Sequence, residues 1–189
     1  MSNIYTLLAV GGILGLAACG GTNTPLTFAE VSQNGEALAD RLLTIPYTDP
    51  SSLPTSGGAV YDGYTGIVLD DSFSVGGELE MRVDFGSADE ISGRVYNVVD
   101  EFETAYTGEL ALSNSIIDRG ADLAVEYTFV VDMTGKLRAD GSTSVVDAYL
   151  AGDFTGLDHQ YVEGIAEGIV TTDGFVQTIT DGGFVGELR

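Results

Sequence analysis

The amino-acid sequence predicts an all-β fold: a single eight-stranded antiparallel up-and-down β-barrel, preceded by a short N-terminal helical cap. Three observations lead to this prediction. From Ala59 onward, apolar and polar residues alternate with a period of two, as they do in strands that bury one face. Clusters of Gly, Asp and Ser divide this region into short segments. No helical pattern in the region is long enough to connect parallel strands, so neighbouring strands are expected to pair through turns.

The first element along the chain is an uncharged apolar segment, Leu7 to Ala18. Its twelve residues are fewer than the roughly 20 that a membrane-spanning helix needs. They fit the core of an export signal peptide, which we place at residues 1–18. The positive charge that usually precedes such a core comes here only from the amino terminus, because Met1–Thr6 contains no Lys or Arg.

The end of this segment, Leu16-Ala17-Ala18-Cys19, resembles the lipobox of bacterial lipoproteins, and Cys19 is the only cysteine in the chain. The resemblance implies that Cys19 becomes the mature N-terminus and carries acyl chains, so that the protein is anchored to a membrane without spanning it. Several chains, at about 0.8 kcal/mol per buried methylene, give stable anchoring. Gly20 stands where an Asp is associated with inner-membrane retention, which implies the outer membrane. The alternative is an ordinary secreted protein in which Cys19 is incidental.

Between the cysteine and the first strand we expect a tether, a cap and a connector. Residues 19–27 are mostly small and polar, which is the composition of a flexible linker. Residues 28–58 form the cap and connector, in which Glu36–Leu43 is weakly helical and too short to be stable alone. Three prolines then predict an irregular path before the barrel domain, which we place at residues 59–189.

Two segments carry the clearest strand pattern. In residues 78–85, apolar side chains alternate with charged ones, so that one face is apolar and the other wholly charged. Residues 123–131 alternate in the same way. The charged face of 78–85 argues against a transmembrane barrel, which needs an outward band free of charge. Weaker alternation predicts six further strands, at 59–69, 91–99, 107–113, 144–155, 161–171 and 175–188.

Glycines support two further predictions. Clusters such as Gly76-Gly77, Asp140-Gly141 and Asp173-Gly174 predict turns, because these residues accept the backbone angles that tight turns require. Other glycines, among them Gly63 and Gly164, lie inside predicted strands, where glycine normally weakens a sheet. Such positions allow the tight coiling of a small closed barrel, which we therefore favour over a sandwich.

Several motifs, taken together, are similar to those of the transferrin-binding-protein-like lipoproteins. They are P-T-S-G-G-A-V-Y-D-G-Y at 54–64, V-D-F at 83–85 with I-S-G at 91–93, and G-D-F-T-G at 152–156 with V-E-G at 162–164. The resemblance implies a single barrel with an anchor, and it suggests a link to iron or haem acquisition. It does not imply transferrin, because the transferrin-binding members are larger and have two lobes, and F-T-G-L stands here for their F-Y-G-P.

Residues that carry chemistry are few, and we predict no catalytic residue, no cofactor and no metal site. His159 is the only histidine, and without a Ser or Asp partner it is expected to be a solvated turn residue before a strand. The tyrosines are expected to fill the barrel or its cap more often than to line a ligand mouth. Five aspartates near turns suggest calcium, but Asp-Gly turns need no metal: Asp132, Asp140, Asp147, Asp173 and Asp181.

The chain is strongly acidic, with 29 Asp+Glu against 7 Lys+Arg and a net charge of −22. This charge excludes nucleic acid as a partner, because affinity for phosphates comes from Lys and Arg. Two interpretations remain. The acids can form a negative surface that attracts a basic partner or a cationic solute, or they can keep a tethered protein soluble. Their even spread, without blocks of like charge, favours solubility.

These observations together predict an outer-membrane or surface-anchored lipoprotein, facing the cell surface or the periplasm, that binds a protein or small solute and is not an enzyme. One alternative is a structural envelope lipoprotein without a small ligand. Another is an enzyme on a barrel scaffold. The barrel interior is the most informative observation, because an empty polar cavity would indicate a ligand, whereas a packed core would place binding on the outer loops.

Overall fold

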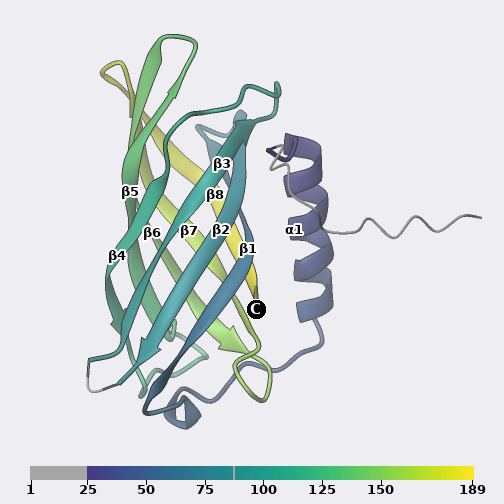
Figure 1. Ribbon diagram of the computed structural model, residues 1–189, viewed down its shortest axis with the longest axis vertical. Helices are drawn as coiled ribbons and strands as arrows, with labels where there is room; N and C mark the ends of the chain where they lie inside the picture. The colour runs from purple at the N-terminus through teal and green to yellow at the C-terminus, as the bar shows by residue number, and fades with distance from the viewer. Residues whose placement is uncertain (1–24, 87) are drawn as a thin grey trace, which may run out of the picture.

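The structure, a computed structural model, describes residues 25–86 and 88–189. The predicted signal peptide at residues 1–18 and the lipidation site Cys19 lie outside the described residues. Eight strands form a closed barrel in which each strand pairs antiparallel with its neighbours in the sequence, and β1 closes the barrel by pairing with β8 (Figure 1). The predicted up-and-down barrel is therefore confirmed. Its strands are β1 (Gly57–Leu69), β2 (Phe73–Phe85), β3 (Glu90–Asp100), β4 (Leu110–Ile117), β5 (Phe129–Ala139), β6 (Ser142–Thr155), β7 (Tyr161–Thr172) and β8 (Phe175–Leu188).

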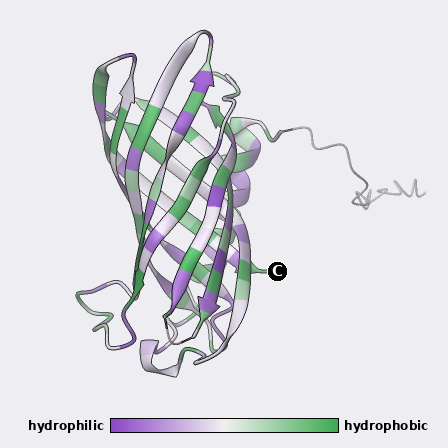
Figure 2. Ribbon diagram, turned by 60° about the vertical axis from the view of Figure 1, so that its left-hand side comes forward, coloured by the Kyte–Doolittle hydropathy of each residue, from purple (hydrophilic) through white to green (hydrophobic). Residues whose placement is uncertain are grey.

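The strands alternate between the barrel interior and the outside as the sequence predicts. On β2, Leu79, Met81 and Val83 are buried in the core, while the charged residues between them lie on the outer face. Figure 2 shows the same alternation of hydrophobic and hydrophilic residues on the other strands. The inward-facing apolar side chains of the strands therefore form one hydrophobic cluster.

One helix, α1 (Phe28–Leu42), lies against the outside of the barrel over β1, β2 and β8 (Figure 1). It is longer than the predicted segment 36–43 because it begins with a capping box. The Thr27 hydroxyl accepts the Glu30 N–H, and the Glu30 carboxylate accepts the Thr27 N–H at 2.8 Å. Its buried face consists of Val31, Leu38 and Leu42.

The turn predicted at Gly76-Gly77 is wrong, because both residues lie inside β2. Gly76 faces outward beneath α1, where an added Cβ would come within 2.9 Å of the Val31 Cγ1 atom. Gly77 faces inward, where a Cβ would come equally close to Val95. Glycine at these positions allows close packing on both faces of the barrel wall. A Gly-Gly pair in a single sequence fits a turn equally well, so the sequence did not distinguish the two.

The strand predicted at residues 123–131 is also misplaced. β5 begins only at Phe129, and residues 118–128 form the β4–β5 loop. Within that loop the Asp122 carbonyl accepts the N–H groups of Val125 and Glu126, which closes a turn across the alternating segment. Val125 is 80% exposed as a result. The alternation of apolar and polar residues therefore continued by chance through a loop. The strand predicted at 107–113 also differs, because β4 begins at Leu110 rather than at residue 107.

Glycines inside the strands permit close approach of neighbouring strands, as predicted. A Cβ on Gly63 of β1 would overlap the Val185 carbonyl group of β8. A Cβ on Gly164 of β7 would overlap the Ala151 carbonyl group of β6. These glycines allow the strong coiling that closes a barrel of this size.

Candidate functional site

The interior of the barrel is solid at the end where β1 begins, which we call the closed end. Aromatic rings meet there from five strands, and the centroids of neighbouring rings lie 5.2 to 6.2 Å apart. Tilted contacts of this kind stabilise a core beyond the effect of the buried area. The rings belong to Tyr61, Phe85, Phe129, Phe154 and Phe184, all fully or almost fully buried.

The connector between α1 and β1 covers the closed end. Leu53, which follows a short 3-10 helix (Pro50–Ser52), is buried against the core. Arg119 of the β4–β5 loop holds this segment by donating to the carbonyl oxygens of Leu53, at 2.7 Å, and Pro54. The same guanidinium pairs with Asp89, Nε to Oδ2, at 2.7 Å. Hydrogen bonding from Arg119 holds the pKa of Asp89 below its usual value.

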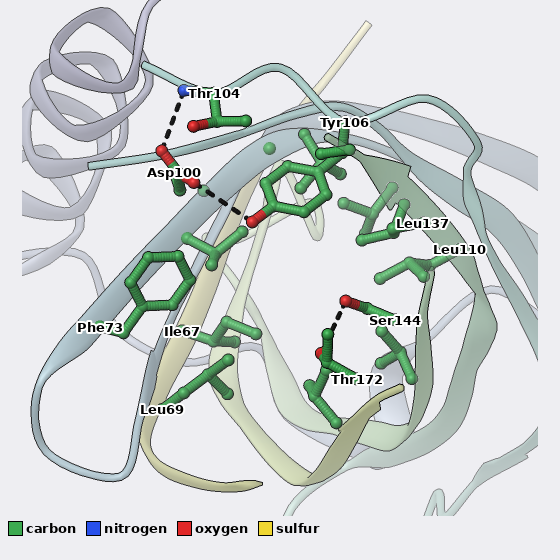
Figure 3. A pocket seen from close by; sticks show the side chains of 18 of the residues that line it. Ile67, Leu69, Phe73, Asp100, Thr104, Tyr106, Leu110, Leu137, Ser144 and Thr172 are labelled. Atoms are coloured by element: carbon green, nitrogen blue, oxygen red, sulfur yellow. Dashed lines mark hydrogen bonds between the residues drawn. The ribbon is translucent and has the colours of Figure 1, made fainter. Parts of the chain in front are cut away.

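The opposite end, which we call the mouth, contains a cavity of about 410 Å³ (Figure 3). This volume falls within the roughly 300–1,000 Å³ that is usual for ligand pockets. The cavity remains because mid-sized aliphatic side chains point to the axis here, while the two aromatic rings of its lining, Phe73 and Tyr106, do not fill the space between them. The mid-sized aliphatic side chains and the one methionine in its wall are Ile67, Leu69, Val75, Val95, Val98, Leu110, Met133, Leu137, Val146 and Val170.

A buried acid is set into the wall of the mouth at the end of β3. Asp100 is 3% exposed, and its Oδ1 accepts the N–H groups of Phe102 and Thr104, each at 2.9 Å. Its Oδ2 accepts the Tyr106 hydroxyl at 3.2 Å (Figure 3). Burial, together with this carboxylate, raises the pKa of Tyr106 to about 12, so the hydroxyl is protonated at neutral pH. Among the described residues that line the cavity there is no Lys, Arg or His to pair with Asp100.

Two hydroxyls and a rim of aromatic side chains complete the mouth. Ser144 of β6 and Thr172 of β7 share a hydrogen bond of 2.8 Å on the wall away from Asp100 (Figure 3). At the rim, Phe102 stacks on Phe73 with centroids 6.1 Å apart and remains 74% exposed. Phe175 at the start of β8 is exposed as well. The mouth is thus a largely apolar cavity with polar groups close to its opening. The deeper Thr65 hydroxyl donates to the Gly183 carbonyl at 3.0 Å.

His159 lies in the β6–β7 turn at the closed end, not in the mouth. The prediction of a turn residue is confirmed, and its φ of +46° is left-handed. Its ring is not freely solvated, because it packs edge-on against Phe85 with centroids 5.4 Å apart. This partial burial lowers the pKa of His159. Its carbonyl oxygen accepts the Tyr61 hydroxyl at 2.7 Å, so the residue helps to seal the core.

The five aspartates considered for calcium are not brought together. Asp132, Asp147 and Asp181 lie on three different strands, and Asp140 and Asp173 lie in two turns. In the part of the chain that the structure describes, no group of three or more His, Cys, Asp or Glu side chains is placed to hold a metal ion. The two turn aspartates have a φ of +50°, a backbone conformation that accounts for their residue type.

Of the tyrosines that the structure describes, one is buried in the core and one lines the mouth, whereas the others are half-buried or exposed elsewhere. Tyr61 fills the closed end as expected, whereas Tyr106 lines the cavity. Sequence reasoning did not single out Asp100, because it stands among other acids and its burial depends on the β3–β4 loop folding over it. The one local signal was its position two and four residues before Phe102 and Thr104, the spacing of an aspartate that caps its own turn.

A second hollow, of about 680 Å³, lies outside the barrel between α1 and the outer faces of β1, β7 and β8. It borders Gly66, Gly164 and Gly183, which leave space beneath the helix. We attribute this hollow to the packing of a helix over a wall rich in glycine. The mouth, enclosed by barrel side chains, is the better candidate site.

Comparisons with protein-family models, curated proteins and solved structures found no match to this chain. In residues 25–86 and 88–189, no helix has the length and apolar character needed to cross a membrane. The fold and the mouth define the class: a small β-barrel with a ligand-sized cavity at one end.

Proposed function

We propose that this protein is a lipid-anchored binding module of the bacterial outer membrane, which holds a small, largely apolar solute in the mouth of its barrel and is not an enzyme. The main support for the proposal is the difference between the two ends of the barrel interior. Aromatic rings fill the closed end, while the mouth keeps a cavity of about 410 Å³ with one buried carboxylate. A barrel that needed only to be stable would fill both ends, because empty space loses dispersion contacts.

The predicted anchor would keep the mouth close to a membrane. α1 begins at the mouth, where the Phe28 N–H donates to the Glu103 carboxylate of the β3–β4 loop at 3.0 Å. Cys19 precedes Phe28 by nine residues, which span at most about 32 Å when extended. An acylated Cys19 thus holds the mouth near the lipid surface, where apolar solutes concentrate.

The resemblance to the transferrin-binding-protein-like lipoproteins supports the same proposal, because it implies a single barrel with an anchor. The resemblance also suggests iron or haem acquisition, which stays a prediction. Among the described residues that line the mouth there is neither a histidine nor a cysteine to ligate iron. A protein partner would instead contact the loops around the rim.

Binding of the apolar fluorescent probe N-phenyl-1-naphthylamine tests the cavity. Residues 25–189 suffice for the assay, because they contain α1 and every strand pairing that closes the barrel. We expect saturable binding by this domain. Val170→Phe fills the mouth from β7 and should weaken binding by about tenfold or more, which corresponds to about 1.4 kcal/mol.

Ile169→Phe is the matched control for this variant. Ile169 is the neighbour of Val170 on β7, but it lies on the outer face and is 39% exposed. The control should bind the probe like the unmodified domain. Equal loss of binding in both variants, or no saturable binding by the unmodified domain, would rule out the mouth as the site.

Cys19→Ala tests the anchor in cells that express the full chain. The unmodified protein should fractionate with membranes and carry the added mass of acyl chains. The variant should leave the membrane fraction, whereas Thr22→Ala, three residues further along, should not. Unchanged fractionation of Cys19→Ala, with no acyl mass on the unmodified protein, would exclude the lipoprotein.

A further inference from the structure

The connections at the mouth carry acidic side chains without basic ones. Four connections lie at this end: the β1–β2, β5–β6 and β7–β8 turns and the β3–β4 loop. None of them contains Lys, Arg or His, and all of their residues are described. The acids are Asp70, Asp71, Glu101, Glu103, Asp140, Asp173 and, at the end of the β3–β4 loop, Glu109.

The basic residues nearest to the mouth point away from the cavity. Lys136 and Arg138 stand on either side of the buried Leu137 on β5, and both are exposed on the outer face. Arg94 of β3 also lies outside, where it pairs with Glu109 at 3.1 Å. A ligand inside the mouth therefore meets carboxylates that no protein cation neutralises from within the described lining.

Asp100 is the carboxylate best placed to act on a ligand. It lines the cavity while almost fully buried, and an electrostatic interaction at such a site is weakened less by water and salt than one on the surface. Its Oδ1 is occupied by two backbone N–H groups, but its Oδ2 accepts only the Tyr106 hydroxyl, at 3.2 Å. A carboxylate oxygen can accept a further hydrogen bond, so Oδ2 is free to accept one from a ligand.

The polar and apolar parts of the cavity are separated along the barrel axis. Asp100 and Thr172 are the last residues of β3 and β7, and Ser144 is close to the start of β6, so these groups lie near the opening. Val95 and Met133 lie further from the opening and belong to the apolar core. This arrangement fits a molecule with one polar head and an apolar tail.

We propose that the mouth selects amphiphiles with a cationic head group, such as alkyl amines, over neutral or anionic ones with the same apolar chain. The ammonium group donates to the Asp100 carboxylate, and the chain extends into the apolar interior. The surrounding acids raise the local concentration of cations and disfavour carboxylates. This inference rests on the proposed function and specifies its ligand class.

Competition by three ten-carbon compounds tests the proposal: decylamine, decanol and decanoate, each displacing N-phenyl-1-naphthylamine from residues 25–189 at pH 7. We expect decylamine to bind at least about tenfold more tightly than decanol, and decanoate to bind most weakly. Equal affinities, or tighter binding of decanoate, would overturn the proposal. If the probe binds and the amine has no advantage, only the head-group inference fails. If the probe does not bind, the proposed function fails as well.

Asp100→Asn assigns the selectivity to this residue. The asparagine Oδ1 can still accept the two N–H groups of the loop, so the variant removes charge while preserving the local geometry. The advantage of decylamine over decanol should fall to about threefold or less, with little change for decanol. Asp84→Asn is the control, since it removes the same charge from an exposed position at the closed end of β2. Equal loss of selectivity in both variants would indicate a general charge effect and contradict the assignment.

Tyr106→Phe keeps the test decisive if Asp100→Asn does not fold. This variant removes the only hydrogen bond to the Asp100 Oδ2 and retains the carboxylate. Affinity for decylamine should rise severalfold while affinity for decanol stays the same. An unchanged affinity for decylamine, or an equal change for both compounds, would count against Asp100 as the contact.

Discussion

The two ends of the barrel use the same eight strands but bring different side chains to the axis. At the closed end Phe154 is surrounded by other aromatic rings, and Leu53 covers them from outside. At the mouth the axis is lined by Val, Leu and Ile with a buried Asp100, and a cavity remains. At both ends every second residue of a strand faces inward. The size of these inward residues therefore decides whether an end of the barrel is solid or hollow.

This contrast separates stability from binding within one small domain. The closed end concentrates aromatic contacts, a capping segment and the ion pair of Arg119 with Asp89. The mouth gives up some of this packing and keeps polar groups near its opening. A rigid end can support a less tightly packed site, because binding residues need a fixed scaffold.

The largest effect expected from this contrast is on stability. Phe154→Ala removes a fully buried ring from the closed end and should lower the free energy of unfolding by about 3–5 kcal/mol. Phe73→Ala makes the same substitution at the rim of the mouth, where the ring is only partly buried, and should cost about 1 kcal/mol. Urea denaturation of both variants measures the difference. Equal losses would show that the two ends contribute alike.

A smaller effect is expected from the cap. Arg119→Gln removes the ion pair with Asp89 and part of the bonding to the connector, and should lower the free energy of unfolding by about 1–2 kcal/mol. Arg138→Gln removes the same charge from the outer face of β5 near the mouth and should change stability by less than about 0.5 kcal/mol. Denaturant midpoints compare the two. An unaltered midpoint for Arg119→Gln would mean that the cap does not depend on this residue.

The smallest effect is the pH dependence of that same pair. The pKa of Asp89 is lowered in the folded protein by hydrogen bonding from Arg119, so the carboxylate stabilises the fold above its unfolded pKa of about 3.9. That contribution is lost as the pH falls through the lowered folded pKa. The stability difference between the unmodified domain and Arg119→Gln should therefore narrow from pH 6 toward strongly acidic pH. A difference that stays constant would contradict the ionic contribution of the pair.

Several elements follow from local sequence because their causes are local. The alternation at residues 78–85 determines which face of β2 is buried, and Asp140 and Asp173 determine two turns through their left-handed backbone. The capping box at Thr27 and Glu30 was also readable, although the prediction started the helix at residue 36. The misplaced strand at 123–131 shows the limit, because alternation in a loop that faces solvent carries no packing information.

The candidate site was not predictable in the same way. Asp100 becomes a cavity residue only because Tyr106, further along the chain, folds back onto it and because inward residues of several other strands leave space beside it. The volume of the mouth depends on the combined size of the inward side chains that several strands contribute to one layer of the barrel. The sequence of a single segment does not reveal that combined size.

The sequence by itself determined an acidic, mostly β chain with a period-two core face, the turns at Asp140 and Asp173, and a single cysteine in a lipobox-like setting. Only the tertiary structure decided that one end is solid and the other hollow, that Gly76 lies beneath a helix, and that an acid is buried where a ligand could meet it. The physical reason is that local periodicity specifies the direction of a side chain, whereas packing and cavities depend on which distant side chains share the same space.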